Sequence, residues 1–355
     1  MQKSRAREAR RRGRLGGFGI GAGLLAAGGA GVTVVAELRH RQAVSDDPLW
    51  PLLSAPLRGA PRAVRTTDGL LLHVEVFGPD QAPTVVLIPG WTEELQVFDL
   101  LTRALVESGL RVVAYDPRGQ GASSAQSVVD QRIERYGQDL AAVLSACCGA
   151  RDDVVVAGHS MGAMALVAWA ESTLAGAHVR AAALISTGVS GLIEAAGVLP
   201  AILPGPARRA LLAALATGEQ PALPVSTPVS RAVSRHALFG PDASAAQLAF
   251  IEPMVWRMPA ALRAGAARTM RDLDLRAALA RLDVPTLVVA GECDRLTPLE
   301  HAERIAGALP NLAELVILER TGHMTPLERP ADLAAALLRL MARVGLDPER
   351  QRAAT

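Results

Sequence analysis

The feature that most constrains the fold is a series of short apolar runs, each separated from the next by a segment with helical spacing. The runs lie at 71–77, 84–88, 111–115, 153–157, 181–185, 286–290 and 314–318, and helical spacing occurs at 95–108, 131–148, after 161 and at 330–343. Most of the runs are apolar throughout, so we expect strands that are buried on both faces. Their alternation with helices predicts an α/β fold, with a mostly parallel sheet flanked by helices.

The alternation stops between about 188 and 275. This stretch contains proline-rich pieces and helical fragments but no strand-like run, and the strand pattern resumes at 286. A helical insertion between two strands of one sheet predicts a cap at one end of that sheet. The expected folded domain therefore covers residues 63–345, with the cap at about 188–275.

The N-terminus differs in character from the rest of the chain. Residues 1–14 form a basic tail with seven basic side chains and Glu8, so this tail carries a net charge of +6 and the rest of the chain is mildly acidic. Residues 15–36 contain no charged side chain, and as a helix they would span about 33 Å, enough for the core of a bilayer. We expect a transmembrane anchor with the folded domain outside the cytoplasm, because a basic flank favours the cytoplasmic side.

Two alternatives remain open for the N-terminal segment. A cleavable signal peptide fits the small residues Val34 and Ala36, where a signal peptidase could cut, and would give a secreted protein. A cytosolic tail is the other alternative. Residues 37–62 are rich in proline and charge, which predicts a linker between the membrane and the domain.

Charge and cysteine content argue against several classes of protein. The folded part is mildly acidic and has no basic motif, so we do not expect nucleic-acid binding. Cys147 and Cys148 are adjacent, so a disulfide between them would be strained, and Cys293 stands alone. No spacing typical of a metal site is found, and we expect neither a metal nor another cofactor.

A short motif with a glycine at each end follows the apolar run 153–157 and opens a helical segment. Its sequence is Gly158-His159-Ser160-Met161-Gly162. The strand–turn–helix context is typical of a nucleophile elbow, in which a sharp turn holds an exposed serine, whereas an ordinary tight turn is the structural alternative. Ser160 is therefore the candidate nucleophile. The backbone amide of Met161, at the start of the helix, is a candidate donor to an oxyanion.

A serine nucleophile needs a base, and the base needs an acid that orients it. His323 follows the last strand-like run and Asp294 follows the run 286–290, so both are expected near the edge of the sheet that carries Ser160. Glu292, which follows the same strand, is the alternative acid. The other histidines, at positions 40, 73, 159, 178, 236 and 301, are interpreted as structural or exposed.

With these motifs, the chain from about 64 to 343 resembles an α/β-hydrolase with a helical cap. The residues that carry the resemblance are the elbow, the segment 116–123 (Asp-Pro-Arg-Gly-Gln-Gly-Ala-Ser), Gly291 with Asp294 and Pro298, and Gly322-His323 with Pro326-Leu-Glu328. The order Ser160, Asp294, His323 is also the order of the triad in this family. The resemblance implies a structural role for 116–121, in a loop beside the pocket.

The resemblance also implies a second oxyanion donor in the loop after the first core strand. Members of the family usually carry His-Gly there, whereas this chain has Pro89-Gly90-Trp91. The donor is the backbone amide after the glycine, so Trp91 would supply it in spite of the change to proline. The Trp91 side chain is interpreted either as a wall of the pocket or as a packing residue.

The activity implied by the resemblance is hydrolysis of carboxylic esters, small or lipidic, through an acyl-enzyme. The cap is poor in charge at 190–230, which favours an apolar group, and it has few acidic residues to bind the amine of a peptide. Thioesterase, carbon–carbon hydrolase and haloperoxidase-like activities use the same triad and stay open. The serine argues against epoxide hydrolases and dehalogenases of this fold, which use an aspartate. A non-catalytic, membrane-tethered binding module is disfavoured because all three triad residues are present.

Overall fold

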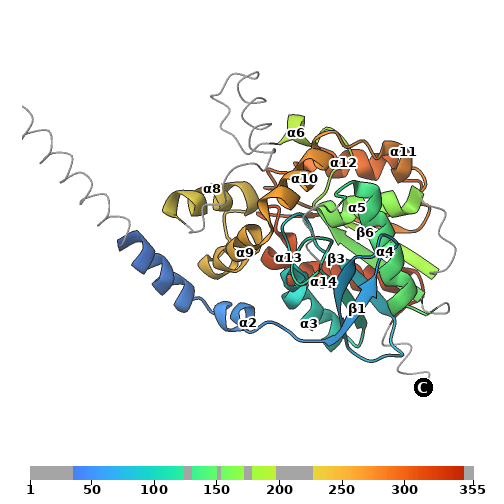
Figure 1. The fold of residues 1–355 in the computed structure, drawn as a ribbon, viewed down its shortest axis with the longest axis horizontal. Helices are drawn as coiled ribbons and strands as arrows, with labels where there is room; N and C mark the ends of the chain where they lie inside the picture. Colours follow the sequence, from blue (N-terminus) through green and yellow to red (C-terminus); the bar gives the residue numbers. More distant parts are fainter. Residues whose placement is uncertain (1–34, 124–129, 150–152, 172–177, 197–226, 348–355) are drawn as a thin grey trace, which may run out of the picture.

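The computed structural model describes residues 35–123, 130–149, 153–171, 178–196 and 227–347. Within these ranges the chain builds one eight-stranded sheet with the strand order β1-β2-β4-β3-β5-β6-β7-β8 (Figure 1). The strands are β1 (Ala60–Arg65), β2 (Leu71–Phe77), β3 (Thr84–Ile88), β4 (Arg111–Tyr115), β5 (Asp153–His159), β6 (His178–Ile185), β7 (Thr286–Gly291) and β8 (Leu312–Leu318). β2 pairs antiparallel with β1 and β4, and the other pairs are parallel, so the predicted mostly parallel sheet is confirmed.

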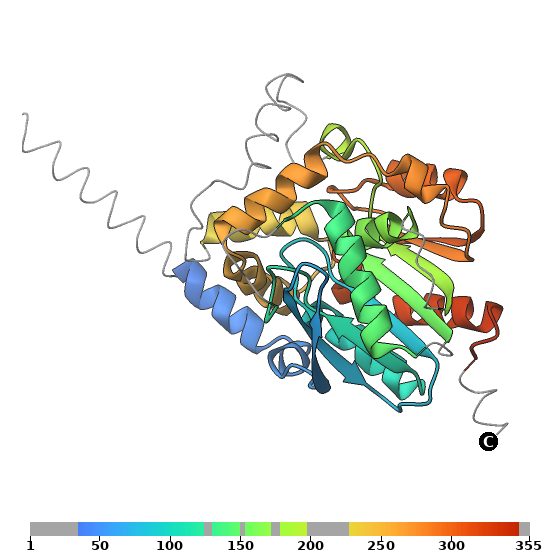
Figure 2. The same cartoon turned by 45° about the vertical axis from the view of Figure 1, so that its right-hand side comes forward.

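Helices cover both faces of the sheet (Figure 2). The helices that flank the sheet and its loops are α3 (Asp99–Glu107), α4 (Ile133–Cys147), α5 (Met161–Glu171), α11 (Arg276–Leu279), α12 (Leu299–Ala308), α13 (Thr325–Glu328) and α14 (Pro330–Arg343), with the 3-10 turn η1 (Leu95–Phe98) before α3. Buried residues of α4, α5 and α12 share one apolar cluster, and those of α3 and α14 share the other. The sheet therefore separates two hydrophobic layers.

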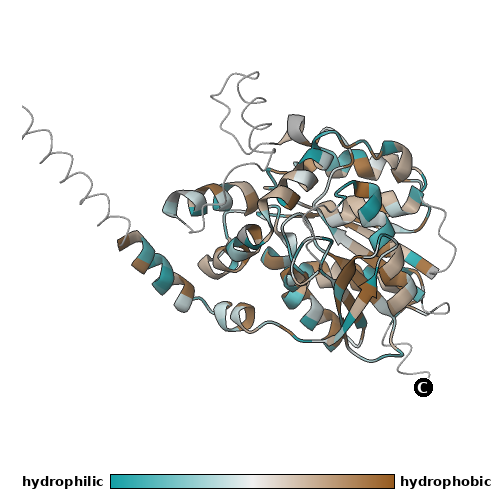
Figure 3. Ribbon diagram, in the orientation of Figure 1, coloured by the Kyte–Doolittle hydropathy of each residue, from teal (hydrophilic) through white to brown (hydrophobic). Residues whose placement is uncertain are grey.

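The burial of the central strands on both faces explains the nearly continuous apolar runs in the sequence. In β3, Val86 and Ile88 belong to the cluster on one face, whereas Val85 and Leu87 belong to the cluster on the other. All five residues of β3 are buried. Because successive side chains of a strand point to opposite faces, a strand with helices on both sides is apolar along most of its length. Figure 3 shows this hydrophobic colouring on the central strands.

The described part of the cap is helical. It contains α6 (Leu192–Ala195), α8 (Pro228–Leu238), α9 (Ala245–Arg257) and α10 (Ala260–Arg271), and α8 to α10 gather at one end of the sheet (Figure 1). The starts of α8 and α9 are fixed by reciprocal capping boxes, in which Thr227 pairs with Ser230 and Ser244 pairs with Gln247. Residues 197–226 of the predicted cap lie outside the described residues.

Residues 37–62, which were predicted to be a linker, contain regular secondary structure and contact the domain at several points. A helix covers 35–45, α2 covers Trp50–Ser54, and β1 already begins at Ala60. Leu53 is buried in the core, and the amide of Leu57 donates to Asp99 at 3.0 Å. A few contacts with the domain fix this segment. They were not predicted, because the segment is rich in proline and charge, which is typical of linkers.

The predicted basic tail 1–14 and most of the predicted anchor 15–36 lie outside the described residues. Only Val35 and Ala36 are described, and they begin the helix at 35–45. Among the helices that the structure describes, none combines the length and the apolar content needed to cross a bilayer.

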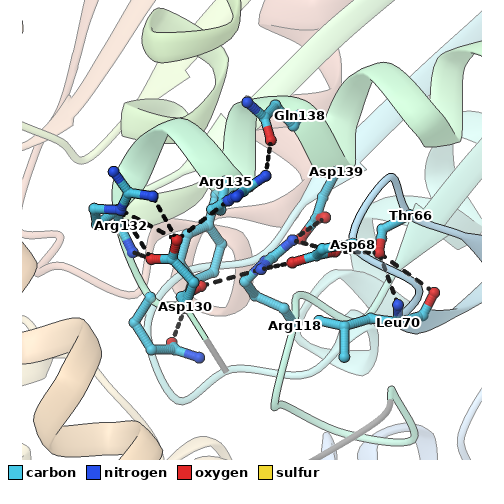
Figure 4. Close-up of polar contacts among 11 residues, drawn as sticks. Thr66, Asp68, Leu70, Arg118, Asp130, Arg132, Arg135, Gln138 and Asp139 are labelled. Carbon is cyan, nitrogen blue, oxygen red and sulfur yellow. Dashed lines mark hydrogen bonds and ion pairs between the residues drawn. The ribbon is translucent and has the colours of Figure 1, made fainter. Parts of the chain in front are cut away.

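A buried arginine anchors the segment 116–123 (Figure 4). The Arg118 guanidinium is 1% exposed and donates two hydrogen bonds to Asp139 of α4, at 2.6 and 2.7 Å. It also donates at 3.0 Å to Asp68, in the turn between β1 and β2. Burial alone would lower the pKa of Arg118, but the bonds to Asp139 and Asp68 raise it above its ordinary value. The loop therefore depends on this residue for its position, as its predicted structural role requires.

We expect Arg118→Met to lower the free energy of unfolding by about 3–5 kcal/mol, because it leaves the buried Asp139 carboxylate without its partner. Urea denaturation followed by circular dichroism measures the change. Arg132→Met is the matched control, since Arg132 pairs with Asp130 on the surface, and its denaturation midpoint should equal that of the unaltered protein. Similar midpoints for the two variants would contradict the anchoring role.

Candidate active site

The turn between β5 and α5 holds Ser160 in a conformation that L-residues rarely adopt. Its φ is +51°, in the left-handed region. The amide of Ser160 donates to the carbonyl of Ile185 on β6 at 2.9 Å, and its own carbonyl accepts from the amide of Ala163 at 3.0 Å. The backbone is thus held from both sides, as the predicted elbow requires.

The two glycines of the motif are required by close backbone contacts. A Cβ atom on Gly162 would lie 2.2 Å from the carbonyl oxygen of Ile88, at the end of β3, and one on Gly158 would lie 2.5 Å from the amide nitrogen of Ala163. No side chain fits at either position. The glycines therefore let α5 start directly against the sheet.

The structure brings the predicted nucleophile, base and acid into one line of hydrogen bonds. Nε2 of His323 lies 3.0 Å from Oγ of Ser160, and Nδ1 of His323 lies 2.8 Å from Oδ2 of Asp294. The three side chains follow β5, β8 and β7, whose carboxyl ends share one edge of the sheet. This is the arrangement in which a histidine can take a proton from a serine hydroxyl.

The environment of Asp294 favours the ionised carboxylate. Its Oδ1 accepts from the amides of Leu296 and Thr297 at 2.8 and 2.9 Å, and its Oδ2 accepts from the Thr297 hydroxyl at 2.8 Å. Burial would raise the pKa of Asp294, but His323 and these bonds hold it below its ordinary value. A buried, charged acceptor beside Nδ1 keeps the His323 proton on that nitrogen and leaves Nε2 free to accept.

Glu292, the alternative acid, lies apart from this line. Its side chain is exposed, and Oε2 accepts from the amide of Arg320 at 2.9 Å. The strand position did not distinguish it from Asp294, but the turn after β7 directs the two carboxylates to different partners.

The loop that carries His323 is joined to the end of the cap helix α8. The amides of His323 and Met324 both donate to the carbonyl of Leu238, at 2.8 and 3.1 Å. Glu328 accepts from the amide of Gly240 at 2.8 Å and from that of Gly322 at 3.0 Å. The position of the base therefore depends on where the cap meets the sheet, a contact that the sequence did not reveal.

One predicted oxyanion donor lies in the elbow and the other in the loop after β3. Met161 is the first residue of α5, and Trp91 lies in the loop after β3, next to Thr92 with a φ of +63°. Neither backbone amide donates a hydrogen bond to another described residue. The Trp91 ring is partly buried and packs against the core, and its Nε1 has no partner in the described part of the chain.

His159 has more polar contacts than the sequence indicated. Its ring is fully buried, with Nδ1 2.9 Å from Oε2 of Glu93 and Nε2 2.8 Å from the carbonyl oxygen of His323. Glu93 was not identified from the sequence at all. Its place three residues after Gly90 is the only signal that could have suggested a role in the oxyanion loop.

Within the described ranges, no cluster of histidine, cysteine, aspartate or glutamate could hold a metal ion.

The chain also matches a known protein family. The profile of the family described as serine aminopeptidase, S33 matches residues 79–330, which is most of the chain. The chain belongs to this family of α/β-hydrolases. The fold and the hydrolase class that the motifs implied are thereby confirmed.

Proteins similar to this chain in sequence or structure are named for different activities. A Variovorax paradoxus protein named as a carbamate hydrolase is 27% identical over 292 residues, which cover 77% of this chain and 97% of that protein. The monoacylglycerol lipase of Mycolicibacterium smegmatis is 29% identical over 246 residues, or 65% of this chain and 78% of the lipase. An esterase structure from Exiguobacterium antarcticum superposes with a TM-score of 0.66 at 20% identity, covering 81% of this chain and 100% of the esterase.

The geometry predicts that Asp294→Asn will lower kcat far more than Glu292→Gln. The amide at 294 can present a donor where His323 needs an acceptor, and we expect a loss of about 10⁴-fold by analogy with serine proteases. Glu292→Gln should stay within about threefold of the unaltered enzyme, since its carboxylate contacts only the amide of Arg320. Measuring kcat for both variants on one ester decides the assignment, and a larger loss in Glu292→Gln would reverse it.

Proposed function

We propose that this protein hydrolyses carboxylic esters of small or lipidic molecules, with Ser160 as nucleophile, His323 as base and Asp294 as the orienting acid. The observation that carries the proposal is the line of hydrogen bonds from Ser160 through His323 to the buried Asp294. The strained backbone of Ser160 supports it, because strain of this kind persists where a function requires it.

The proposed reaction has two steps. His323 takes the hydroxyl proton as Oγ of Ser160 attacks the ester carbonyl, and the amides of Trp91 and Met161 donate to the oxyanion that forms. His323 then gives the proton to the leaving alcohol, which departs and leaves an acyl-enzyme. Water attacks the acyl-enzyme by the same route, with His323 again as base, and releases the acid and the free serine.

The lipase among the relatives supports an ester substrate with an apolar group. The family description raises aminopeptidase activity as a second candidate. The described cap helices α8, α9 and α10 argue against it, because their only acidic residue, Glu252, is buried and they offer no exposed carboxylate to a substrate amine. The exposed carboxylates of the described cap loops, Asp242, Asp272 and Asp274, are each paired with an arginine. Thioester, carbon–carbon and haloperoxidase-like reactions use the same triad, so only a comparison of substrates separates them from ester hydrolysis.

We also propose that residues 15–36 anchor the protein in a membrane, with the domain outside the cytoplasm. The support is the uncharged segment after the basic tail, together with the contacts of the helix that follows it. Glu37 of this helix pairs with Arg231 of α8 at 2.8 Å, and Asp47 accepts from the amide of Ala246 at the start of α9 at 3.0 Å. An anchor at this end would hold the cap near the membrane, where a lipidic ester would arrive.

Ser160→Ala should abolish hydrolysis of p-nitrophenyl butyrate, with a loss in kcat on the order of 10⁶-fold by analogy with serine proteases, and should leave the fold intact. A fluorophosphonate probe should label the unaltered protein and not the variant. Aminoacyl p-nitroanilides, thioesters, a β-diketone and a halogenation assay are tested in parallel. Faster turnover of any of these than of the esters would replace the proposed substrate class, and labelling of Ser160→Ala would refute the nucleophile.

The full-length chain should fractionate with membranes and resist extraction by salt, whereas a chain that begins at Val35 should be soluble and equally active. The shorter chain keeps Glu37 and the buried Val44, so the contacts with the cap survive. Ultracentrifugation, immunoblotting and mass measurement give the result. Full-length protein of uncleaved mass in the soluble fraction would contradict the anchor, and a shortened mass would indicate a cleaved signal peptide.

A further inference from the structure

A buried side chain donates a hydrogen bond to the carbonyl of the peptide unit between Gly90 and Trp91, on the side opposite the N–H of that unit. Nε2 of Gln120 donates to the carbonyl oxygen of Gly90 at 3.1 Å. Gln120 is 2% exposed and lies in the segment 116–123 that Arg118 anchors. In a trans peptide unit the C=O and N–H bonds point in opposite directions, so a donor that fixes the carbonyl of Gly90 also fixes where the Trp91 amide points.

The preceding peptide unit is held by a second buried side chain. The amide of Gly90 donates to Oε2 of Glu93 at 2.6 Å, and Glu93 is 4% exposed. With the N–H held by Glu93 and the C=O held by Gln120, both backbone dihedrals of Gly90 are restricted. Glycine is the residue with the greatest backbone freedom, so these two hydrogen bonds fix a conformation that the glycine backbone would not keep by itself.

Glu93 is in turn in contact with His159. Nδ1 of His159 lies 2.9 Å from Oε2 of Glu93, the oxygen that also accepts from the amide of Gly90. Nε2 of His159 faces the carbonyl oxygen of His323, which can only accept, so Nε2 carries a proton and donates it to this bond. When Glu93 is ionised, Nδ1 also donates to it, and the ring is an imidazolium. Burial opposes this charge, but Glu93 raises the pKa of His159 above its ordinary value.

We propose that Gln120, with the Glu93–His159 pair, acts as a positioning device that aims the Trp91 amide at the oxyanion of the reaction. The proposal rests on the proposed acyl-transfer function. The chain of bonds runs from the backbone of His323 through His159 and Glu93 to Gly90 and ends at Gln120, so it sets the oxyanion loop relative to the base. Gln120 also withdraws electron density from the Gly90 carbonyl, and this makes the N–H of the same peptide a stronger donor.

A purely structural role for Gln120 predicts different behaviour. A side chain that only fills space would affect the amount of folded enzyme and not the affinity of the folded enzyme for a tetrahedral oxyanion. A trifluoromethyl ketone adds to a serine nucleophile and forms such an oxyanion, so its inhibition constant Ki reports on the donors directly.

The test compares Gln120→Leu with Gln131→Leu. Leucine fills similar space without a donor. Gln131 is the matched control because it is also a buried glutamine with a single side-chain hydrogen bond, to Tyr136, and makes no bond to the loop 89–92. Rates on p-nitrophenyl butyrate are divided by the number of active sites titrated with a fluorophosphonate, so misfolded protein does not enter kcat.

For Gln120→Leu we expect kcat to fall by roughly 10–100-fold with KM within about threefold, and Ki for the ketone to rise by the same factor as kcat/KM falls. Gln131→Leu should keep both constants within about threefold, even if its melting temperature falls. Glu93→Gln should shift kcat and Ki in the same direction as Gln120→Leu, since it removes the charge that holds His159 and the amide of Gly90. Should Gln120→Leu not fold, Gln120→Met is judged by the same two constants.

An unchanged Ki in folded Gln120→Leu would overturn the positioning role, and so would an equal loss in Gln131→Leu. Both outcomes differ from failure of the proposed function. If the unaltered protein neither hydrolyses esters nor reacts with the fluorophosphonate at Ser160, the acyl-transfer function is refuted and the positioning role with it.

Discussion

The strained backbone at Ser160 is the constraint on which the rest of the site depends. A non-glycine residue in the left-handed region costs on the order of 1–3 kcal/mol and persists only when its surroundings fix it. Here the surroundings are the sheet itself, because the amide of Ser160 bonds to β6 and Gly162 lies against the end of β3. The elbow therefore exists only after β3, β5 and β6 have paired in register.

The polar groups around the elbow form two buried systems with different tasks. Asp294 accepts four hydrogen bonds and is held ionised, which suits a residue that orients His323. Separately, Glu93 contacts the amide of Gly90 and His159, and His159 contacts the carbonyl oxygen of His323, so this pair ties the loop 89–92 to the backbone of His323. Such pairs are costly to bury, so their value lies in fixing geometry more than in adding stability.

Much of the fold and of the site could be predicted from local patterns, and the failures have physical causes. The central strands were found because both of their faces are apolar, whereas β1 was missed because it is an edge strand with mostly exposed residues. The segment 37–62 was taken for a linker because single buried contacts, such as that of Leu53, leave no periodic signal. Glu93 was missed for the same reason, since its partners lie 3 and 66 residues away in the chain.

The sequence by itself determined the α/β architecture and the identity of Ser160, Asp294 and His323 as candidates, because hydrophobic periodicity and the glycines of a tight turn are local properties. Strand position did not separate Asp294 from Glu292, which follow the same strand two residues apart, and only the family resemblance favoured Asp294. The tertiary structure shows which carboxylate contacts the histidine: Asp294 bonds to Thr297 and His323, whereas Glu292 bonds to the amide of Arg320. Hydrogen bonds between distant segments depend on how the strands align in space, and no local pattern encodes that alignment.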